Sequence, residues 1–379
     1  MTKDRLTSLS DKLTGAKRLV IKIGSALLID EDSDLRRDWM RALATDIVRL
    51  RDRGQEVVIV SSGAVALGAQ ALGTAGEKRR LQDNQAAAAV GQVRLAHAWQ
   101  EVLADHDITV AQILLTLEDT ETRRRYLNAR DTVETLLSMG VVPVINENDT
   151  VATQELRYGD NDRLAARVAQ MVSADCLIIL SDVDGLHTKN PEADPDAQLV
   201  EIVDDINQNI VDMAGAPKKL SVGSGGMITK ITAAKIAVAS GCHVLLTNGT
   251  HDQPIARFEA GGRGTWFTAK ENSVSQHKQW LAGTLTAAGK MFIDEGALAA
   301  LQQGKSLLPA GVTSIEGDFQ RGDTVVVIAP DGTERARGLA AYSSTEARKI
   351  MGHNSRDMED ILGYRGRGEL IHRDNLVLH

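Results

Sequence analysis

Short apolar runs alternate with helical patterns along the N-terminal part of the chain. The runs have the length of β-strands and are almost continuously hydrophobic: RLVIKIG (18–24), QEVVIVSSGA (55–64), ITVAQILLT (108–116), VVPVINEND (141–149), DCLIILSD (175–182) and CHVLLTNG (242–249). Helical patterns separate most of them, notably at residues 38–54, 128–139 and 163–171, and a small-residue helix follows the second run. This alternation is typical of a parallel sheet. The sequence therefore predicts an α/β fold with a mostly parallel open sheet covered by helices on both faces.

The pattern changes after residue 267. Residues 268–286, which include AKENSVSQHKQ, are polar and are interpreted as a linker. The helical stretch DEGALAALQQG (294–304) comes next, and apolar β-type runs follow it, with Asp331-Gly332 as a hairpin-turn signal;. We predict a first domain over residues 1–267, a linker over 268–286, and a smaller β-rich domain over 287–379.

Composition narrows the class of protein. The chain has 379 residues, enough for two or three domains, with 43% hydrophobic and 25% charged residues;. Its net charge of −8 argues against a protein that coats nucleic acid;. Cys176 and Cys242 lie in apolar runs and are expected to be buried and reduced;. The N-terminus resembles no signal peptide, and no apolar run approaches the ~20 residues of a membrane helix, so we expect a cytoplasmic protein.

Several polar residues follow the strands directly, and ligands of such sheets bind at the carboxyl ends of strands. Lys22 ends the first strand, where an ammonium group needs water or an anion;. Ser62 follows the second strand and opens a helix, so it is either an ordinary helix cap or part of an anion site;. Ser181 and Asp182 follow the fifth predicted strand, where a simple turn is equally consistent with the pattern.

A glycine-rich loop also indicates a phosphate-binding site. In SVGSGGMITK (221–230) the glycines allow backbone N–H groups to approach phosphate oxygens, and Lys230 adds positive charge at the start of a helix;. The loop is not a Walker A motif, and the GKS at 304–306 lacks the first glycine of that motif;. Dinucleotide, serine-hydrolase and zinc-site motifs are absent from the sequence.

Acids and amides gather in INENDT and GDND. Two lysines that approach one phosphate repel each other, and Asp162 between them would orient both. A substrate with an α-amino group needs an anionic or amide partner, which Asp149 and Asn161 could supply. The alternative is a negatively charged helix N-terminus with capping residues.

An ordered set of motifs resembles the amino acid kinase family, in particular its members that phosphorylate free glutamate. The matching pieces are VIKIGS, IVSSGAVALG, LNARDT, PVINENDTVAT, GDNDRLAA, LSDVDGLHT and GSGGMITK, and they span most of residues 18–267. The C-terminal pieces DEGALAAL, SLLPAGV, GDFQRGD and HRDN resemble a PUA domain. The resemblance thus covers the whole chain.

The resemblance implies three groups of site residues. The catalytic group would act on the transferring phosphoryl: Lys22, Asp162 and Lys230. The substrate group would hold glutamate: Ser62, Asp149 and Asn161. The ATP group would bind the nucleotide: Lys22, Ser181, Asp182, Ser224, Gly225, Gly226, Met227, Ile228, Thr229 and Lys230. Protein ligands of a metal stay unassigned.

The implied reaction is ATP-dependent phosphorylation of the γ-carboxylate of L-glutamate, the first step of proline biosynthesis. ATP and Mg²⁺ are the expected cofactors, proline the expected inhibitor, and a homo-oligomer (dimer or tetramer) the expected assembly. N-acetylglutamate, aspartate or a nucleoside monophosphate remains an alternative acceptor. RNA binding through the PUA-like domain is the other alternative, although residues 287–379 hold 11 Lys and Arg against 13 Asp and Glu, which is unfavourable for RNA;.

Overall fold

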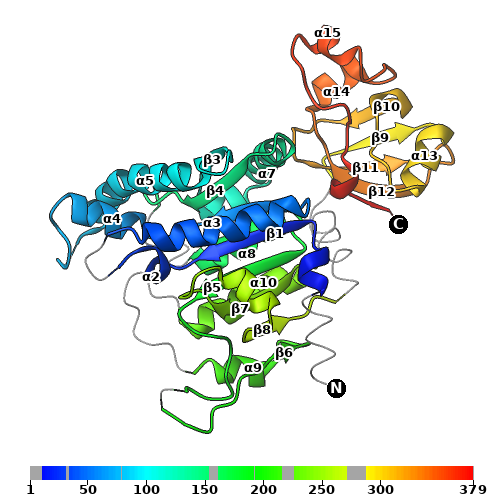
Figure 1. The fold of residues 1–379 in the computed structure, drawn as a ribbon. Helices are drawn as coiled ribbons and strands as arrows, with labels where there is room; N and C mark the ends of the chain where they lie inside the picture. Colours follow the sequence, from blue (N-terminus) through cyan, green and yellow to red (C-terminus); the bar gives the residue numbers. More distant parts are fainter. Residues whose placement is uncertain are drawn as a thin grey trace. The chain divides into compact units, whose positions relative to one another are not determined.

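The computed structural model divides the chain into two compact units, residues 1–271 and 272–379. The residues that it describes are 11–30, 34–77, 79–152, 161–191, 193–215, 226–270 and 287–378. Each unit has a sheet of its own (Figure 1). The predicted linker lies largely outside the described residues, so its boundaries stay a prediction.

The sheet of the first unit is mostly parallel, as predicted. Its described strands are β1 (Arg18–Ile23), β2 (Glu56–Val60), β3 (Val110–Leu115), β4 (Val142–Glu147), β5 (Cys176–Ser181), β6 (Ile202–Val203), β7 (His243–Asn248) and β8 (Gly264–Phe267). Their order is β3-β4-β2-β1-β5-β7-β8-β6. Among the described strand pairs of this sheet, only β7–β8 is antiparallel.

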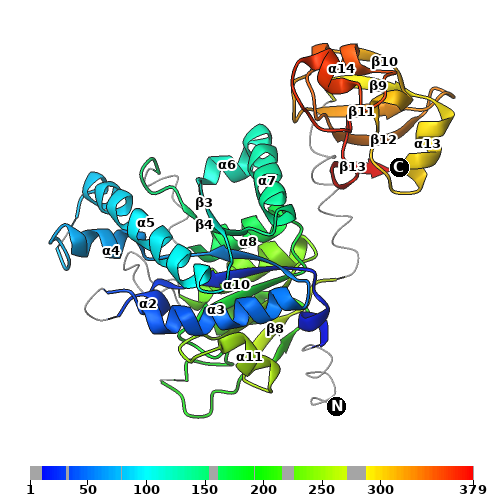
Figure 2. The same cartoon turned by 45° about the horizontal axis from the view of Figure 1, so that its top comes forward.

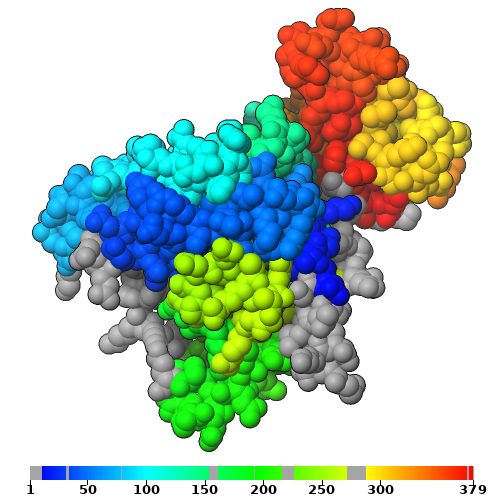
Figure 3. All heavy atoms as spheres, viewed as in Figure 1, coloured from blue at the N-terminus to red at the C-terminus, as the bar shows by residue number. Residues whose placement is uncertain are grey.

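Helices cover both faces of this sheet (Figures 1 and 2). One face carries α3 (Arg37–Asp52), α5 (Leu81–Ala104) and α11 (Pro254–Glu259). The opposite face carries α8 (Asn161–Met171) and α10 (Met227–Ala239). Figure 3 is viewed from the side of the first face, and the atoms of α3 and α5, coloured blue to cyan, lie at the front of the first unit. Further helices of this unit include α2 (Ser25–Leu28), α4 (Ala64–Ala71), α6 (Leu117–Glu121), α7 (Arg123–Ser138) and α9 (Gln208–Met213).

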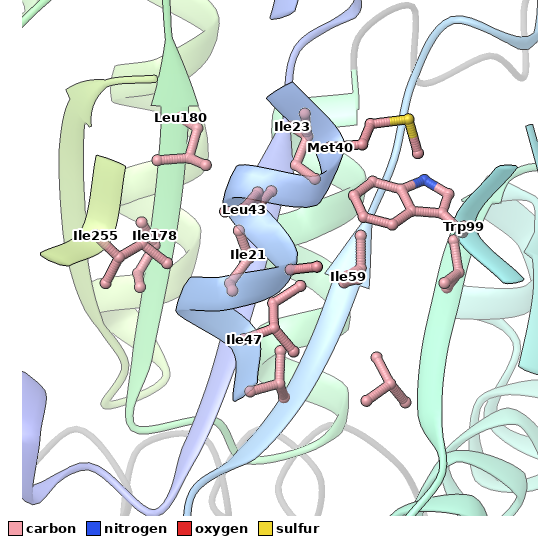
Figure 4. Close-up of a cluster of buried hydrophobic side chains, with 14 of the residues drawn as sticks. Ile21, Ile23, Met40, Leu43, Ile47, Ile59, Trp99, Ile178, Leu180 and Ile255 are labelled. Carbon is pink, nitrogen blue, oxygen red and sulfur yellow. The ribbon is translucent and has the colours of Figure 1, made fainter. Parts of the chain in front are cut away.

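Alternation along β1 decides which face each side chain reaches. Ile21 and Ile23 point into the cluster of buried apolar side chains under α3 (Figure 4). Successive side chains of a strand point to opposite faces, so Lys22 between them reaches the face covered by α8 and α10. The cluster also contains these labelled side chains: Met40, Leu43, Ile47, Ile59, Trp99, Ile178, Leu180 and Ile255.

The predicted helices are present with shifted ends. Residues 38–54 and 163–171 correspond to α3 and α8, whereas α7 begins at Arg123, before the predicted start at residue 128. The small-residue helix after β2 is α4. The 24-residue α5 is not indicated by the sequence pattern, because its alanine-rich start carries little hydrophobic periodicity;.

The second unit is β-rich, as predicted. Its described strands are β9 (Gly289–Ile293), β10 (Val312–Gly317), β11 (Thr324–Ile328), β12 (Glu334–Leu339) and β13 (Leu376–Leu378), in the order β10-β9-β11-β12-β13. Antiparallel β11 and β12 are joined through Asp331-Gly332, with Gly332 at a φ of 80°, so the hairpin prediction is confirmed. Its described helices are α13 (Glu295–Gln302), α14 (Ser344–Ile350), α15 (Met358–Leu362) and the 3₁₀ turns η1 (Pro309–Gly311) and η2 (Arg373–Asn375).

Both cysteines are buried and form no disulfide, as expected. Burial raises the pKa of the Cys176 thiol and of the Cys242 thiol, so neither is set up as a nucleophile;. Among the described helices, none combines the length and the apolar character that crossing a membrane requires.

Candidate active site

The central strand β1 lies where the order of the sheet reverses. It pairs with β2 on one side and with β5 on the other, all three parallel. The chain passes from β1 to β2 in one direction and later returns to β5 in the other. Ligands of open α/β sheets bind at such switch points, beyond the carboxyl ends of the strands. Lys22, Ser62 and Ser181 are all at these ends.

A buried carboxylate joins two lysines at this point. Asp162, in the first turn of α8, is fully buried and forms an ion pair with the ammonium of Lys22. The ammonium nitrogen of Lys230 lies 3.2 Å from Oδ2 of Asp162. Thr229 donates a hydrogen bond from its hydroxyl to the same oxygen at 3.1 Å. Lys22 and Lys230 are only 5% and 6% exposed, so both charges lie inside the protein.

The charges of this cluster favour an ionised aspartate. Burial alone would raise the pKa of Asp162, but the charges and hydrogen bonds of Lys22 and Lys230 hold that pKa well below its ordinary value;. The carboxylate also lies at a helix N-terminus, where the helix dipole favours negative charge;. The three side chains carry one net positive charge, which suits an anionic ligand.

Small residues allow α8 to bring Asp162 close to β1. Ala165, Ala166 and Ala169 are all fully buried on the side of α8 that packs on the sheet. They follow Asp162 at the spacing of one helix face. The helix therefore approaches β1 closely enough for Asp162 to reach Lys22.

A second polar cluster lies next to the first along the chain. Asn161 precedes Asp162, and its amide nitrogen donates to the backbone oxygen of Ser61 at 2.6 Å, to Oγ of Ser62 at 3.1 Å and to Oδ1 of Asn146 at 2.8 Å. Gly63, with a φ of 100°, turns the chain from Ser62 into α4;. The structure thus brings Asn161 and Ser62 together, although they come from different strand–helix connections.

Asp149, the third predicted substrate residue, lies in the turn directly after β4 and is half-buried. It therefore lies at the carboxyl end of a strand adjacent to β2, as expected for a residue near the site.

The predicted nucleotide residues lie at β5 and α10. Ser181 ends β5 and donates its hydroxyl hydrogen bond to Asp182 at 2.9 Å. Gly226 precedes α10, and Met227, Ile228 and Thr229 form its first turn before Lys230. The predicted Ser224 and Gly225 lie outside the described residues.

Two buried polar residues of the second cluster are missed by the sequence analysis. Asn146 accepts from Asn161, and its own amide nitrogen donates to Oε1 of Gln92 in α5 at 2.8 Å. Asn146 lies in the motif INENDT, in which only the acidic Asp149 is predicted to be a site residue. Gln92 is a polar residue in an alanine-rich segment, and no local pattern marks it as buried.

Comparison with known proteins agrees with this architecture. Residues 17–248 match the family model of the amino acid kinase family, and residues 289–362 match the PUA domain. A protein named glutamate 5-kinase from Paramagnetospirillum magneticum is 55% identical over 97% of this chain and 99% of its own length.

Two further relatives carry the same name. That of Rhodospirillum rubrum is 55% identical over 95% of this chain and 96% of its own length. That of Agrobacterium fabrum is 53% identical over 97% of this chain and 94% of its own length. Because the family model matches residues 17–248 and these relatives align over almost the whole chain, the chain belongs to the amino acid kinase family.

Proposed function

We propose that the protein is an ATP-dependent kinase that phosphorylates the γ-carboxylate of L-glutamate, giving L-glutamyl 5-phosphate and ADP. This reaction is the first step of proline biosynthesis. The observation that carries the proposal is Asp162 paired with Lys22 and Lys230, directly beside the cluster of Asn161 and Ser62. The relatives named glutamate 5-kinase, aligned along almost the whole chain, support glutamate as the acceptor.

The chemistry requires charge stabilisation more than proton transfer. A γ-carboxylate is ionised at pH 7, so its oxygen can attack the γ-phosphorus without a general base. The new bond joins that oxygen to phosphorus, while the bond from phosphorus to the bridging oxygen of ADP breaks. Both reactants are anions, and their repulsion forms part of the barrier. Two buried ammonium groups would reduce the contribution of this repulsion to the barrier, since a pre-organised charge is effective where water is excluded.

The two clusters would divide the work. Lys22 and Lys230 would contact the phosphates and the transferring group, and Asp162 would hold both ammonium groups in place against their mutual repulsion. Asn161 directs its amide nitrogen at protein acceptors, so it presents its oxygen to a ligand. An amide oxygen suits an α-ammonium group, and Asp149 would add a negative charge for the same group. Ser62, at the start of the α4 connection, would hold a carboxylate.

The nucleotide would lie beyond β5 and α10. Ser181 and Asp182 would contact it together with residues 224–230, among them Gly226, whose backbone opens α10. Mg²⁺ is part of the proposal and would neutralise phosphate charge. The family resemblance implies that the phosphate oxygens themselves would be its main ligands.

Inhibition by proline and assembly into dimers or tetramers are also proposed, on the family resemblance alone. Proline should raise the KM for glutamate in steady-state assays, and the mass in solution should be two or four times that of the 40.8 kDa chain. Proline-insensitive kinetics or a monomer mass would contradict these two points separately.

A direct assay tests the acceptor. ATP turnover should depend on L-glutamate, and hydroxylamine should trap the acyl phosphate as a hydroxamate. N-acetyl-L-glutamate, L-aspartate and a nucleoside monophosphate are the comparison acceptors. The proposal fails if one of them supports a higher kcat/KM than L-glutamate, or if no hydroxamate forms.

A further inference from the structure

Three amide side chains form a chain of hydrogen bonds that runs from a buried residue of α5 to the proposed acceptor site. Its members are Gln92 in α5, Asn146 in β4 and Asn161 in α8. The amide nitrogen of Asn161 donates to Oδ1 of Asn146, and the amide nitrogen of Asn146 donates to Oε1 of Gln92, both at 2.8 Å. Gln92 is 8% exposed and Asn146 only 2%, so water has little access to the bond between them, whereas Asn161 at the other end is half-buried.

Backbone groups fix the direction of this chain. The carbonyl of Ser61 can only accept, so the group of Asn161 that lies 2.6 Å from it must be the nitrogen;. The N–H of Glu147 can only donate, and it donates to Oδ1 of Asn146 at 2.9 Å;. The amide nitrogen of Asn146 is thereby turned toward α5, where it needs an acceptor. Gln92 supplies that acceptor.

The close backbone contact between α4 and α5 holds Gln92 in its position. A Cβ on its neighbour Gly91 would lie 1.8 Å from the backbone oxygen of Ala64, the first residue of α4. A Cβ on Gly68 would lie 1.7 Å from the backbone oxygen of Ala87. The two helices therefore touch through their backbones directly beside Gln92. Because α4 follows the turn at Ser62, this contact links Gln92 to the segment between β2 and α4. Through Asn146, Gln92 is also linked to Asn161 at the start of α8.

One further bond runs from α5 to the same place. The indole N–H of Trp99, two helical turns after Gln92, donates to Oγ of Ser61 at 3.1 Å. Gln92 and Trp99 thus lie on one face of α5, and each supports a strand end of the acceptor site.

We propose that Gln92 is a positioning residue for the phosphoryl acceptor. It does not touch the substrate; through Asn146 it holds Asn161 with the oxygen directed at the α-ammonium group of the amino acid. This inference rests on the proposed function, because it assumes that Asn161 contacts the acceptor. Loss of Gln92 should therefore weaken acceptor binding and leave the nucleotide site unchanged.

The test compares Gln92→Met with Gln100→Met in the full-length protein. Methionine keeps the length of Gln92 but cannot accept the bond from Asn146, whereas Gln100 is exposed on the same helix. The loss of one buried hydrogen bond predicts a KM for glutamate raised about 3- to 10-fold in Gln92→Met. KM for ATP and kcat should stay within about twofold, and Gln100→Met should match the wild type.

Two outcomes overturn the inference: an unchanged KM for glutamate, or equal rises in KM for glutamate and for ATP, which indicate general loosening. If Gln92→Met does not fold, Gln92→Glu and Gln92→Asn decide the point. In Gln92→Glu the side chain keeps a hydrogen-bond acceptor at the same distance, so the KM for L-glutamate should stay at the wild-type value. In Gln92→Asn the side chain is one methylene too short, so that KM should rise. Equal KM values in these two variants would refute the role. A wild-type protein without glutamate-dependent turnover would instead refute the proposed function.

Discussion

The ammonium nitrogen of Lys230 lies 3.2 Å from Oδ2 of Asp162, although the two residues are 68 positions apart in the chain. The same carboxylate pairs with Lys22 from the central strand. One buried acid therefore joins three elements, β1, α8 and α10, at the point where the sheet reverses its order. Stability and the proposed catalysis should depend on this contact together.

Replacing the acid should destabilise the fold. Asp162→Asn leaves two buried lysines without their shared counter-charge, and we expect a loss of about 3–5 kcal/mol in the free energy of unfolding. Urea denaturation measures it. Asp38→Asn makes the same change at an exposed ion pair with Arg41, where we expect less than about 1 kcal/mol;. Equal losses in the two variants would mean that the buried ion pairs of Asp162 stabilise the fold no more than an exposed ion pair does.

The stabilisation by Asp162 should depend on pH in a defined direction. Its pKa is lower in the folded protein than the ~3.9 of an unfolded aspartate, because the two lysines favour the ionised form;. A lowered pKa means that the contribution is complete above the unfolded value and is lost as the pH falls toward the folded value. The difference in unfolding free energy between wild type and Asp162→Asn should therefore be constant from about pH 7 to 5 and shrink below about pH 4. A difference that stays constant down to pH 3 would contradict this assignment.

Asp149 should affect acceptor binding more than turnover. Asp149→Ala removes a proposed partner of the α-ammonium group, and we expect the KM for glutamate to rise about tenfold or more. The KM for ATP serves as the internal control and should change by less than about twofold. If the KM for glutamate is unchanged, the acceptor does not reach the turn after β4.

The backbone contact between α4 and α5 should be intolerant of a methyl group. Gly91→Ala would force the helices apart and cost about 1–3 kcal/mol in unfolding free energy;. The same shift should raise the KM for glutamate, because it moves Gln92. Gly15→Ala is the control, since a Cβ there meets no atom within 4 Å. Thermal unfolding of both variants measures the effect, and similar midpoints would show that the helices can separate without cost.

The strand ends of the site could be predicted from local patterns, and its supporting contacts could not. Apolar runs located β1, β2 and β5, and the carboxyl-end rule then pointed to Lys22, Ser62 and Ser181. Charge suggested a carboxylate such as Asp162 between two lysines, and the family resemblance assigned that role to Asp162. These inferences need only short stretches of sequence.

The role of α5 depends on long-range packing that no local pattern encodes. Gln92 meets Asn146 across 54 positions of the chain, and next to it Gly91 and Gly68 allow the backbones of α4 and α5 to touch. An alanine-rich helix has a weak hydrophobic period, so the buried face of α5 could not be identified from the sequence.

The most direct measurement of the central claim is the kcat of Lys230→Met compared with that of Lys235→Met. Both lysines lie on α10, but Lys230 contacts Asp162 while Lys235 is exposed. If buried ammonium groups stabilise the transferring phosphoryl, Lys230→Met should lower kcat by about 100- to 1,000-fold, and Lys235→Met should leave it unchanged. A Lys230→Met variant that folds and turns over L-glutamate and ATP at the wild-type rate would contradict the account.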